Sequence, residues 1–289
     1  MKRGFINFWL FAALLCTCTN PFKDDEITGA HKKITGKVTV EGVTQPADVY
    51  VWLEQINVGV FTDDNGEFAL QLPSKATSPE MESLSGTFNL YFMTINFNLD
   101  TATVLLRNGE FEYGKADINK NGRLRKDITL SKIFKVVSEV SIKEVFKYGK
   151  MVTILTVHST VSAAMGTATI NIPNGTDMYL GAICLLNLDT GEIQLSSSAN
   201  PLNRTFNFFI PVTTSGIVLE YAMDLQAIAH KNEKYIVIPY IMSATRAPSE
   251  LYQSLGFDPA YFSTEFAKIL FDHQSQVFTI KVEDLPIPE

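Results

Sequence analysis

The chain has 289 residues and a formal net charge of -7, from 24 lysines and arginines against 31 aspartates and glutamates. This length exceeds the usual size of one domain, so we expect two domains that each bury a core. A nucleic-acid binder needs clustered positive charge to displace counterions from phosphates, and the sequence has no sizeable basic cluster. Nucleic acid is therefore not an expected partner. The 20 phenylalanines, 10 tyrosines and many β-branched residues favour a mainly β fold.

Residues 1–18 have the layout of an export signal. Lys2 and Arg3 precede an apolar run from Phe5 to Leu15. The run is too short to cross a bilayer as a helix, and its basic start is typical of a secretory signal peptide. We therefore expect these residues to direct export and then to be removed.

The end of this signal, Cys16-Thr17-Cys18, resembles that of a bacterial lipoprotein, in which a cysteine is acylated before cleavage. Thr17 is smaller than Leu15 and favours Cys18 as the lipid-attachment residue, with Cys16 as the alternative. An ordinary cleaved signal with two incidental cysteines is the other alternative. The resemblance implies a protein of the bacterial cell envelope, held on a membrane by its N-terminal lipid.

A lipid anchor has two further consequences for the chain. Residues 19–32 become a flexible polar tether, and the expected membrane is the outer membrane, at its periplasmic or its surface face. A lipidated Cys18 also leaves Cys184, which lies in an apolar run, without a partner for a disulfide. We therefore expect Cys184 to be a small buried hydrophobic residue.

Residues 33–132 are predicted to form the first antiparallel β-sandwich. Alternating apolar and polar residues predict strands at Ile34–Val40, Val49–Glu54, Val58–Thr62 and Glu67–Leu72. Asp63–Gly66 is predicted to join the last two as a tight hairpin, because Asn-Gly tolerates positive φ angles. Further strands are expected at 89–99 and 104–130, with a hairpin turn at Arg107–Glu110.

Three motifs of this segment resemble the carboxypeptidase regulatory-like domain, a transthyretin-like β-sandwich common in exported bacterial proteins. They are Gly36-Lys37-Val38, Ala47-Asp48-Val49-Tyr50-Val51, and Thr62–Leu70 followed by Pro73. The inserted Ser74–Ser85 departs from the family, which has a short turn there. The resemblance implies a scaffold or spacer, because none of the matched residues is catalytic in the family.

The loop after these strands has part of a calcium-binding pattern. Asp117, Asn119 and Asn121 occupy its first, third and fifth positions, with Gly122 at the sixth. The twelfth position holds Ile128 instead of a bidentate acid, and the flanking residues favour strands rather than helices. A solvated turn is the preferred interpretation and calcium the alternative, so no metal or other cofactor is expected.

Residues 133–289 are predicted to form a second, immunoglobulin-like sandwich. Turn signals separate its predicted strands, which are 136–145, 151–161, 167–172, 178–188, 192–196, 205–212, 217–221, 235–242 and 276–282. A helical segment at 249–271 interrupts this pattern, with Asp258-Pro259 as its expected helix start. We expect it to cover one end of the sandwich, and a lid or docking element is the alternative.

The sequence offers no convincing set of catalytic residues. Asp189-Thr190-Gly191 is a single copy of a motif that aspartic proteases need twice, so a hairpin turn is the better interpretation. The four histidines, which lack metal-ligand spacing, are His31, His158, His230 and His273. His158 and Ser159 are neighbours on a predicted strand and point to opposite faces. The aromatic run Phe206–Phe209 is expected in the core.

We therefore expect a protein that is not an enzyme. The favoured function is a membrane-anchored lipoprotein that serves binding, adhesion or envelope assembly through an unidentified protein or glycan partner. One alternative is a subunit of a fimbria-like or secretion-associated polymer. The other is a carbohydrate-binding or hydrolase accessory protein, which exposed and coplanar Tyr50, Trp52 and Tyr91 would favour.

Overall fold

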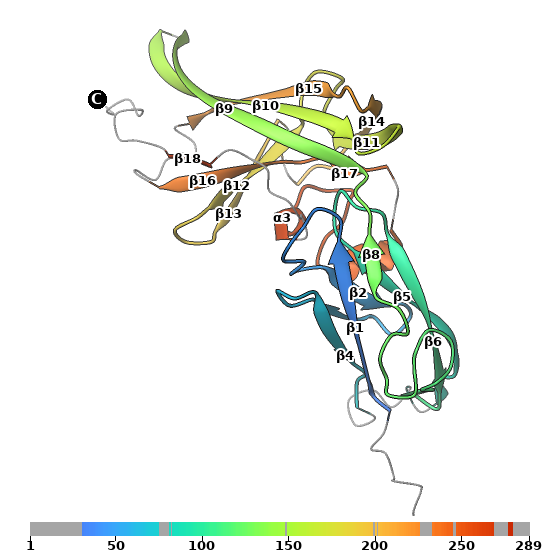
Figure 1. The fold of residues 1–289 in the computed structure, drawn as a ribbon. Coiled ribbons are helices and arrows are strands. Elements are labelled where there is room, and N and C mark those ends of the chain that lie inside the picture. Colours follow the sequence, from blue (N-terminus) through green and yellow to red (C-terminus); the bar gives the residue numbers. More distant parts are fainter. Residues whose placement is uncertain are drawn as a thin grey trace, which may run out of the picture. The chain divides into compact units, whose positions relative to one another are not determined.

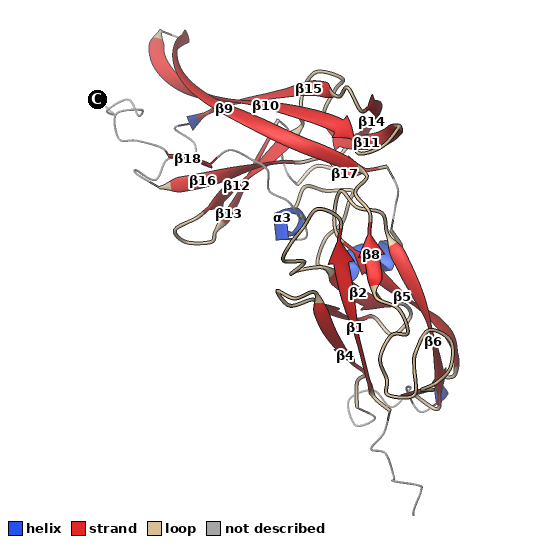
Figure 2. Cartoon of the chain, viewed as in Figure 1, coloured by secondary structure: helices blue, strands red, loops and turns tan. Residues whose placement is uncertain are grey.

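The computed structural model describes residues 31–74, 81, 83–147, 149–198, 200, 202–225, 233–244, 247–268 and 277–279. These residues are mainly β, in several antiparallel sheets with only two short helices (Figures 1 and 2). The predicted fold class is confirmed. The predicted signal peptide with Cys16 and Cys18, and two of the histidines, His230 and His273, lie outside the described residues.

The strands between residues 33 and 130 form two sheets. The larger sheet has the order β3 (Val58–Phe61), β2 (Tyr50–Leu53), β5 (Gly86–Met93), β6 (Asp100–Arg107) and β7 (Glu110–Phe111). The smaller sheet has the order β4 (Glu67–Gln71), β1 (Lys33–Val40) and β8 (Ile128–Leu130). The β1–β8 pair is parallel, and the other pairs are antiparallel. Alternate side chains of these strands, such as Val38, Leu70 and Leu90, form one buried cluster.

The Asp63–Gly66 turn forms where it is predicted but does not close a hairpin. β3 pairs with β2, whereas β4 pairs with β1 in the other sheet. Asp63 Oδ1 accepts the backbone N–H groups of Asn65 and Glu67, each at 2.9 Å, and Gly66 has a φ of 75°. The hairpin prediction is wrong because alternation decides which face a residue occupies, not which strand lies beside it.

The position of Gly66 allows a test with a matched control. A Cβ on Gly66 would lie 2.1 Å from the Val38 carbonyl oxygen, whereas a Cβ on Gly42 meets nothing within 4 Å. Both glycines have positive φ, 75° and 76°, so both alanine variants are strained by about 1–2 kcal/mol. We expect Gly66→Ala to lower the free energy of unfolding by roughly 3 kcal/mol or more. Urea denaturation that gives equal losses for Gly66→Ala and Gly42→Ala would contradict this.

Other boundaries in this part of the chain also differ from the prediction. The hairpin turn at Arg107–Glu110 is confirmed, since β6 pairs with β7 across it. Residues 112–127, in contrast, are predicted as strand but form turns, with an isolated bridge between Ile118 and Leu124. Arg125 keeps this loop folded by donating to the carbonyl oxygens of Ala116 and Gly114 at 2.9 and 2.7 Å.

The strands from residue 134 onward form three further sheets. The first has the order β15 (Ile217–Asp224), β10 (Lys150–Ala163) and β9 (Phe134–Lys147). The second has the order β14 (Asn207–Thr213), β11 (Thr167–Pro173) and β17 (Met242–Ser243). The third has the order β13 (Ile193–Ser197), β12 (Ala182–Asn187), β16 (Lys234–Pro239) and β18 (Val277–Thr279). A second buried cluster, which includes Leu155, Ile172, Leu185 and Val237, lies among them.

The two helices are α2 (Ser249–Ser254) and α3 (Glu265–Lys268). The predicted helical segment is therefore confirmed as helical in part, but its predicted start at Asp258-Pro259 is wrong. Asp258 Oδ1 accepts the Ala260 N–H at 2.8 Å in a turn, and α3 begins later, where Ser263 Oγ accepts the Glu265 N–H at 3.1 Å. The proline suits the turn as well as it would a first helical turn.

A third hydrophobic cluster joins these helices to strands from both halves of the chain. It includes Trp52 of β2, Cys184 of β12, and Tyr240 and Phe266 near the C-terminal end. Tyr50 Oη lies 3.0 Å from Ser254 Oγ at its edge. Contacts group residues 32–289 as one unit, so the division into domains at residues 33–132 and 133–289 stays a prediction.

Candidate ligand-binding site

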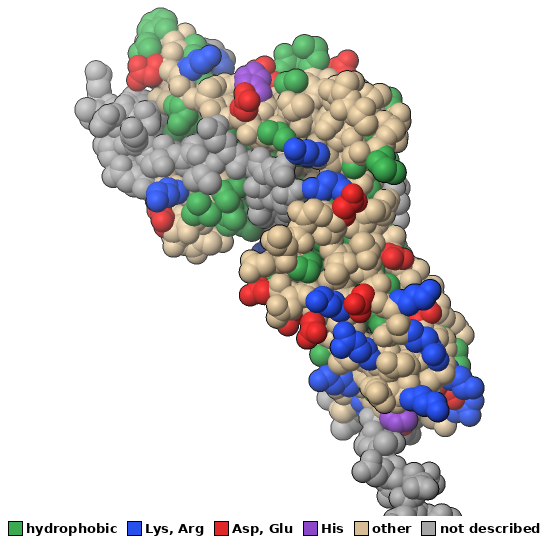
Figure 3. Space-filling model, in the orientation of Figure 1, with side chains coloured by type: hydrophobic (Ala, Val, Ile, Leu, Met, Phe, Trp, Pro, Cys, Tyr) green, Lys and Arg blue, Asp and Glu red, His purple; other side chains and the backbone are tan. Residues whose placement is uncertain are grey.

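Exposed hydrophobic side chains are concentrated in one part of the chain. Apart from Phe61, the large exposed hydrophobic residues among those described lie between Val137 and Tyr261. Figure 3 shows lysine and arginine side chains interspersed with acidic ones over the sheets of residues 33–130. The apolar surface that could contact a ligand therefore lies mainly in the sheets after residue 134.

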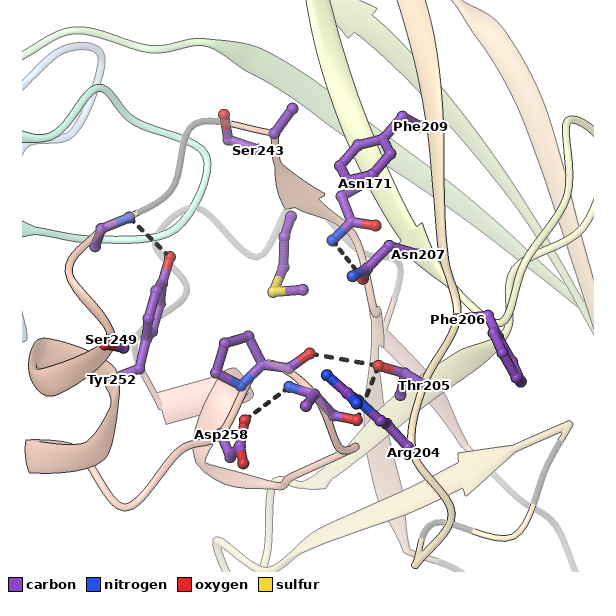
Figure 4. Close-up of a pocket in the computed structure, with 15 residues that line it drawn as sticks. Asn171, Arg204, Thr205, Phe206, Asn207, Phe209, Ser243, Ser249, Tyr252 and Asp258 are labelled. Atoms are coloured by element: carbon purple, nitrogen blue, oxygen red, sulfur yellow. Dashed lines mark hydrogen bonds between the residues drawn. The ribbon is translucent and has the colours of Figure 1, made fainter.

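One cavity there, the cleft, has a volume of about 740 Å³ (Figure 4). One wall is a face of the β14-β11-β17 sheet, where Asn171 pairs with Phe209 on one side and with Met242 on the other. Ile170 and Ile172, the neighbours of Asn171 on β11, belong to the buried cluster. Because side chains alternate along a strand, the cleft lies on the sheet face opposite to that core.

The other wall of the cleft consists of Ala244 and of residues between Ala247 and Ala260, a stretch that includes α2. Hydrogen bonds tie this segment to the loop before β14. The Thr205 N–H donates to the Ala260 carbonyl oxygen at 2.7 Å, and Thr205 Oγ1 donates to the same oxygen at 3.0 Å. Phe206 is held from the other side, since its N–H donates to Asn174 Oδ1 at 2.6 Å. Both walls are therefore anchored.

Two amide side chains lie on the sheet wall. Asn171 Nδ2 donates to Asn207 Oδ1 at 3.0 Å, and Asn171 is 7% exposed (Figure 4). Asn171 Oδ1 has no hydrogen-bond partner within the described part of the chain. This oxygen has almost no accessible surface, so a ligand in the cleft does not reach it in this conformation, and the unpaired acceptor costs about 1–3 kcal/mol.

The aromatic run at the cleft corrects one prediction. Phe206, Phe208 and Phe209 are 83%, 40% and 45% exposed, so the expected place of this run in the core is wrong. Phe206 and Phe209 both line the cleft. β14 pairs with β11 alone among the described strands, so it lies at an edge of its sheet. Asn207, a polar residue within the run, was the signal in the sequence that favoured exposure.

The three aromatic residues whose exposure would favour a carbohydrate-binding protein do not form an exposed platform. Trp52 and Tyr50 are 2% and 6% exposed and belong to the third cluster. Tyr91 is partly buried and packs against Trp52 with ring centroids 5.7 Å apart. A carbohydrate site at these residues is therefore ruled out by their burial.

The cleft also holds one basic and one acidic side chain. In Figure 4 the guanidinium of Arg204 reaches into the cleft from the loop before β14. It makes no ion pair or hydrogen bond with any residue that the structure describes. Asp258 lies on the opposite wall and uses Oδ1 for the Ala260 N–H. The cleft can therefore both donate and accept hydrogen bonds without a large net charge.

A second hollow, the side hollow, adjoins the cleft. Its volume is about 420 Å³, and its lining includes Asn174 and Phe208. It shares Arg204, Phe206 and Asn207 with the cleft. These three residues therefore separate two hollows that one extended ligand could fill together.

Two of the three residues of the possible calcium loop, Asp117 and Asn119, use side-chain oxygens within the protein. Asp117 Oδ2 accepts the Thr103 N–H at 2.7 Å. Asn119 Oδ1 accepts the backbone N–H groups of Asn121 and Arg123 at 2.8 and 3.0 Å. No group of three or more histidine, cysteine, aspartate or glutamate residues that could hold a metal ion occurs among the residues searched, which are the described ones.

The other candidate chemical groups have structural roles. Asp189-Thr190-Gly191 forms the predicted turn between β12 and β13, where Asn187 Oδ1 accepts the Asp189 and Thr190 N–H groups at 2.9 and 3.2 Å. His158 is half-exposed and faces Glu220 at 4.0 Å, while Ser159 is buried 2.9 Å from the Ser138 hydroxyl. Opposite orientations of His158 and Ser159 are thus confirmed.

Cys184 is buried with no exposed surface, as predicted, and carries a free thiol. Burial raises the pKa of this thiol to about 12. A thiol that stays protonated at neutral pH is a poor nucleophile. Cys184 therefore acts as a packing residue of the third cluster.

Within the described ranges, no helix has the length and apolar character needed to cross a membrane.

Comparisons with known proteins add little to this description of the cleft. A scan against protein-family models finds no match, and no curated protein matches the chain. Among solved structures, the chain is similar to "The Bacillus anthracis TIE protein", with a TM-score of 0.23 and 9% identity. The match covers 75% of this chain and 46% of that one, so this chain spans less than half of that protein's length. A likeness of this size supports no conclusion about function.

Proposed function

We propose that this protein is a lipid-anchored, non-catalytic lipoprotein of the bacterial cell envelope that binds a ligand in the cleft. The cleft is the observation that carries the binding function. It combines exposed aromatic rings with a guanidinium that has no partner among the residues the structure describes. Binding sites are mostly apolar hollows of this size with a few placed polar groups.

In this proposal the chain has three successive parts. The lipid on Cys18 attaches the protein to the membrane, and residues 19–32 form the tether. Residues 33–132 serve as a spacer of the carboxypeptidase regulatory-like kind. The strands at the residues of its three motifs, β1, β2 and β4, are compatible with that resemblance. Residues 133–289 present the cleft to the ligand.

The anchor is tested by replacing each leader cysteine in turn. We expect Cys18→Ser to move the protein from the membrane fraction to the soluble fraction, because attached acyl chains each contribute about 0.8 kcal/mol per buried methylene. Cys16→Ser is the matched control and should remain in the membrane fraction. Mass spectrometry of the native protein should find a lipid on an N-terminal Cys18. An unmodified N-terminus, or loss of anchoring in Cys16→Ser alone, would contradict the assignment.

A further inference from the structure

We infer that the cleft and the side hollow together bind a linear oligosaccharide, with one sugar ring on Phe209 and a later one on Phe206. This inference rests on the proposed binding function and names its ligand class. It follows from three observations: where the cleft lies on the sheet, which groups line it, and how it continues into the side hollow.

The position of the cleft argues against an extended peptide as its ligand. Peptides that add to a sheet do so at an edge, where their backbone pairs with unpaired N–H and carbonyl groups. The cleft instead lies over the face of the β14-β11-β17 sheet, at the side chains of Asn171, Phe209 and Met242. A ligand in the cleft is therefore recognised by side chains.

The lining matches the chemistry of a sugar. A pyranose ring has an apolar face of C–H groups, which suits the exposed rings of Phe209 and Phe206. Its hydroxyl groups each donate one hydrogen bond and accept two. The Arg204 guanidinium lacks an acceptor among the described residues. A sugar hydroxyl can supply that acceptor and can also donate to the Asp258 carboxylate on the opposite wall.

The charged side chains in the cleft further restrict the chemical class of the ligand. Arg204 and Asp258 give one positive and one negative side chain among its lining residues. A nucleotide or a polyphosphate is recognised by several positively charged hydrogen-bond donors. One guanidinium facing one carboxylate does not provide several such donors. This pair of charges suits a hydroxyl-rich ligand with little net charge.

The side hollow makes the site longer than one sugar. Arg204, Phe206 and Asn207 line both hollows, and Phe206 is 83% exposed between them. The cleft alone has the volume of a site for a drug-sized ligand, which is the size of a disaccharide. A chain that continues past Phe206 would fill the side hollow as well. Affinity should therefore rise with the number of sugar units.

Isothermal titration calorimetry of the full chain tests this inference. The probes are maltose-series and chitin-series oligosaccharides, each from the single sugar to the hexasaccharide. We expect binding in at least one series, with the hexasaccharide bound at least tenfold more tightly than the disaccharide. Phe209→Ala should weaken every member of that series about tenfold, since aromatic stacking contributes about 0.5–1.5 kcal/mol. Phe206→Ala should weaken the longer members more than the disaccharide, because Phe206 lines both hollows.

Phe146→Ala is the matched control for these variants. Phe146 is 70% exposed on β9 and lines neither hollow, so its replacement should leave the affinities unchanged. Far-ultraviolet circular dichroism should show that all three variants are folded. Affinities that do not depend on chain length, or that are equal in Phe209→Ala and wild type, would overturn the inference.

A parallel titration with a library of short peptides separates two kinds of failure. If no sugar of either series binds but peptides bind and lose affinity in Phe209→Ala, the oligosaccharide inference is wrong and the proposed binding function stands. If neither sugars nor peptides bind the wild-type chain, both the inference and the cleft as a binding site are rejected.

Discussion

Tyr240→Ala is expected to lower the free energy of unfolding by about 3–5 kcal/mol, the range for removing a large buried aromatic side chain. Tyr240 is 1% exposed. Its ring stacks on Phe266 with centroids 3.9 Å apart and meets the edge of Phe262 at 5.0 Å. These two phenylalanines follow Asp258–Ala260, which form part of the cleft wall. The variant should therefore also weaken ligand binding, as urea denaturation and calorimetry will measure.

Tyr240→Phe is the control for this prediction. It keeps the ring contacts and removes the hydrogen bond in which Tyr240 Oη accepts the Ser263 N–H at 3.3 Å. The expected loss is about 1 kcal/mol. Equal losses for Tyr240→Phe and Tyr240→Ala would show that the hydrogen bond, rather than the ring packing, stabilises this cluster.

Alkaline pH is expected to destabilise the protein strongly. Burial raises the pKa of the Cys184 thiol from 9.0 to about 12, and burial with the nearby Glu233 raises that of Tyr235 from 10.0 to about 12. Between these values the unfolded chain loses protons that the folded chain keeps, so the free energy of unfolding falls as pH rises. Full stability is present below pH 9 and is lost towards pH 12. The raised pKa of the Cys184 thiol alone corresponds to a loss of about 4 kcal/mol in the free energy of unfolding, at about 1.4 kcal/mol per pKa unit.

The measurement is a series of urea denaturations from neutral to alkaline pH. Cys184→Ala removes one of the shifted groups, so its free energy of unfolding should fall less steeply above pH 9 than that of wild type. The comparison uses the slope, because the alanine also leaves a small cavity that lowers stability at every pH. Identical slopes would show that the thiol ionises equally easily in the folded and unfolded chains.

The sequence was most informative about individual strands. β1, β4 and β10 lie close to their predicted positions, because alternation of apolar and polar residues follows directly from one buried and one exposed face. Strand partners were not predictable in the same way. The Asp63–Gly66 turn has the expected residues, yet β4 pairs with β1, which precedes it by about thirty residues in the chain.

The candidate site could not be found from the sequence because exposure depends on distant residues. Trp52 and Phe209 both lie in strands rich in aromatic residues. Trp52 is buried because residues some two hundred positions later, such as Phe257 between the two helices, pack into the same cluster. Phe209 stays exposed because its sheet face opens onto the cleft. Local pattern cannot distinguish these cases, since each is decided by long-range contacts.

The position of β1 has a mechanical consequence. β1 starts at Lys33, where the chain enters the described structure, and β4 and β8 pair with its first and second halves. On the side away from β4, the Thr35 N–H donates to the Gly122 carbonyl oxygen at 2.9 Å. Tension applied along the chain at this end would therefore have to shear several hydrogen bonds together instead of peeling them apart singly. Such an arrangement suits a strand that transmits pulling forces.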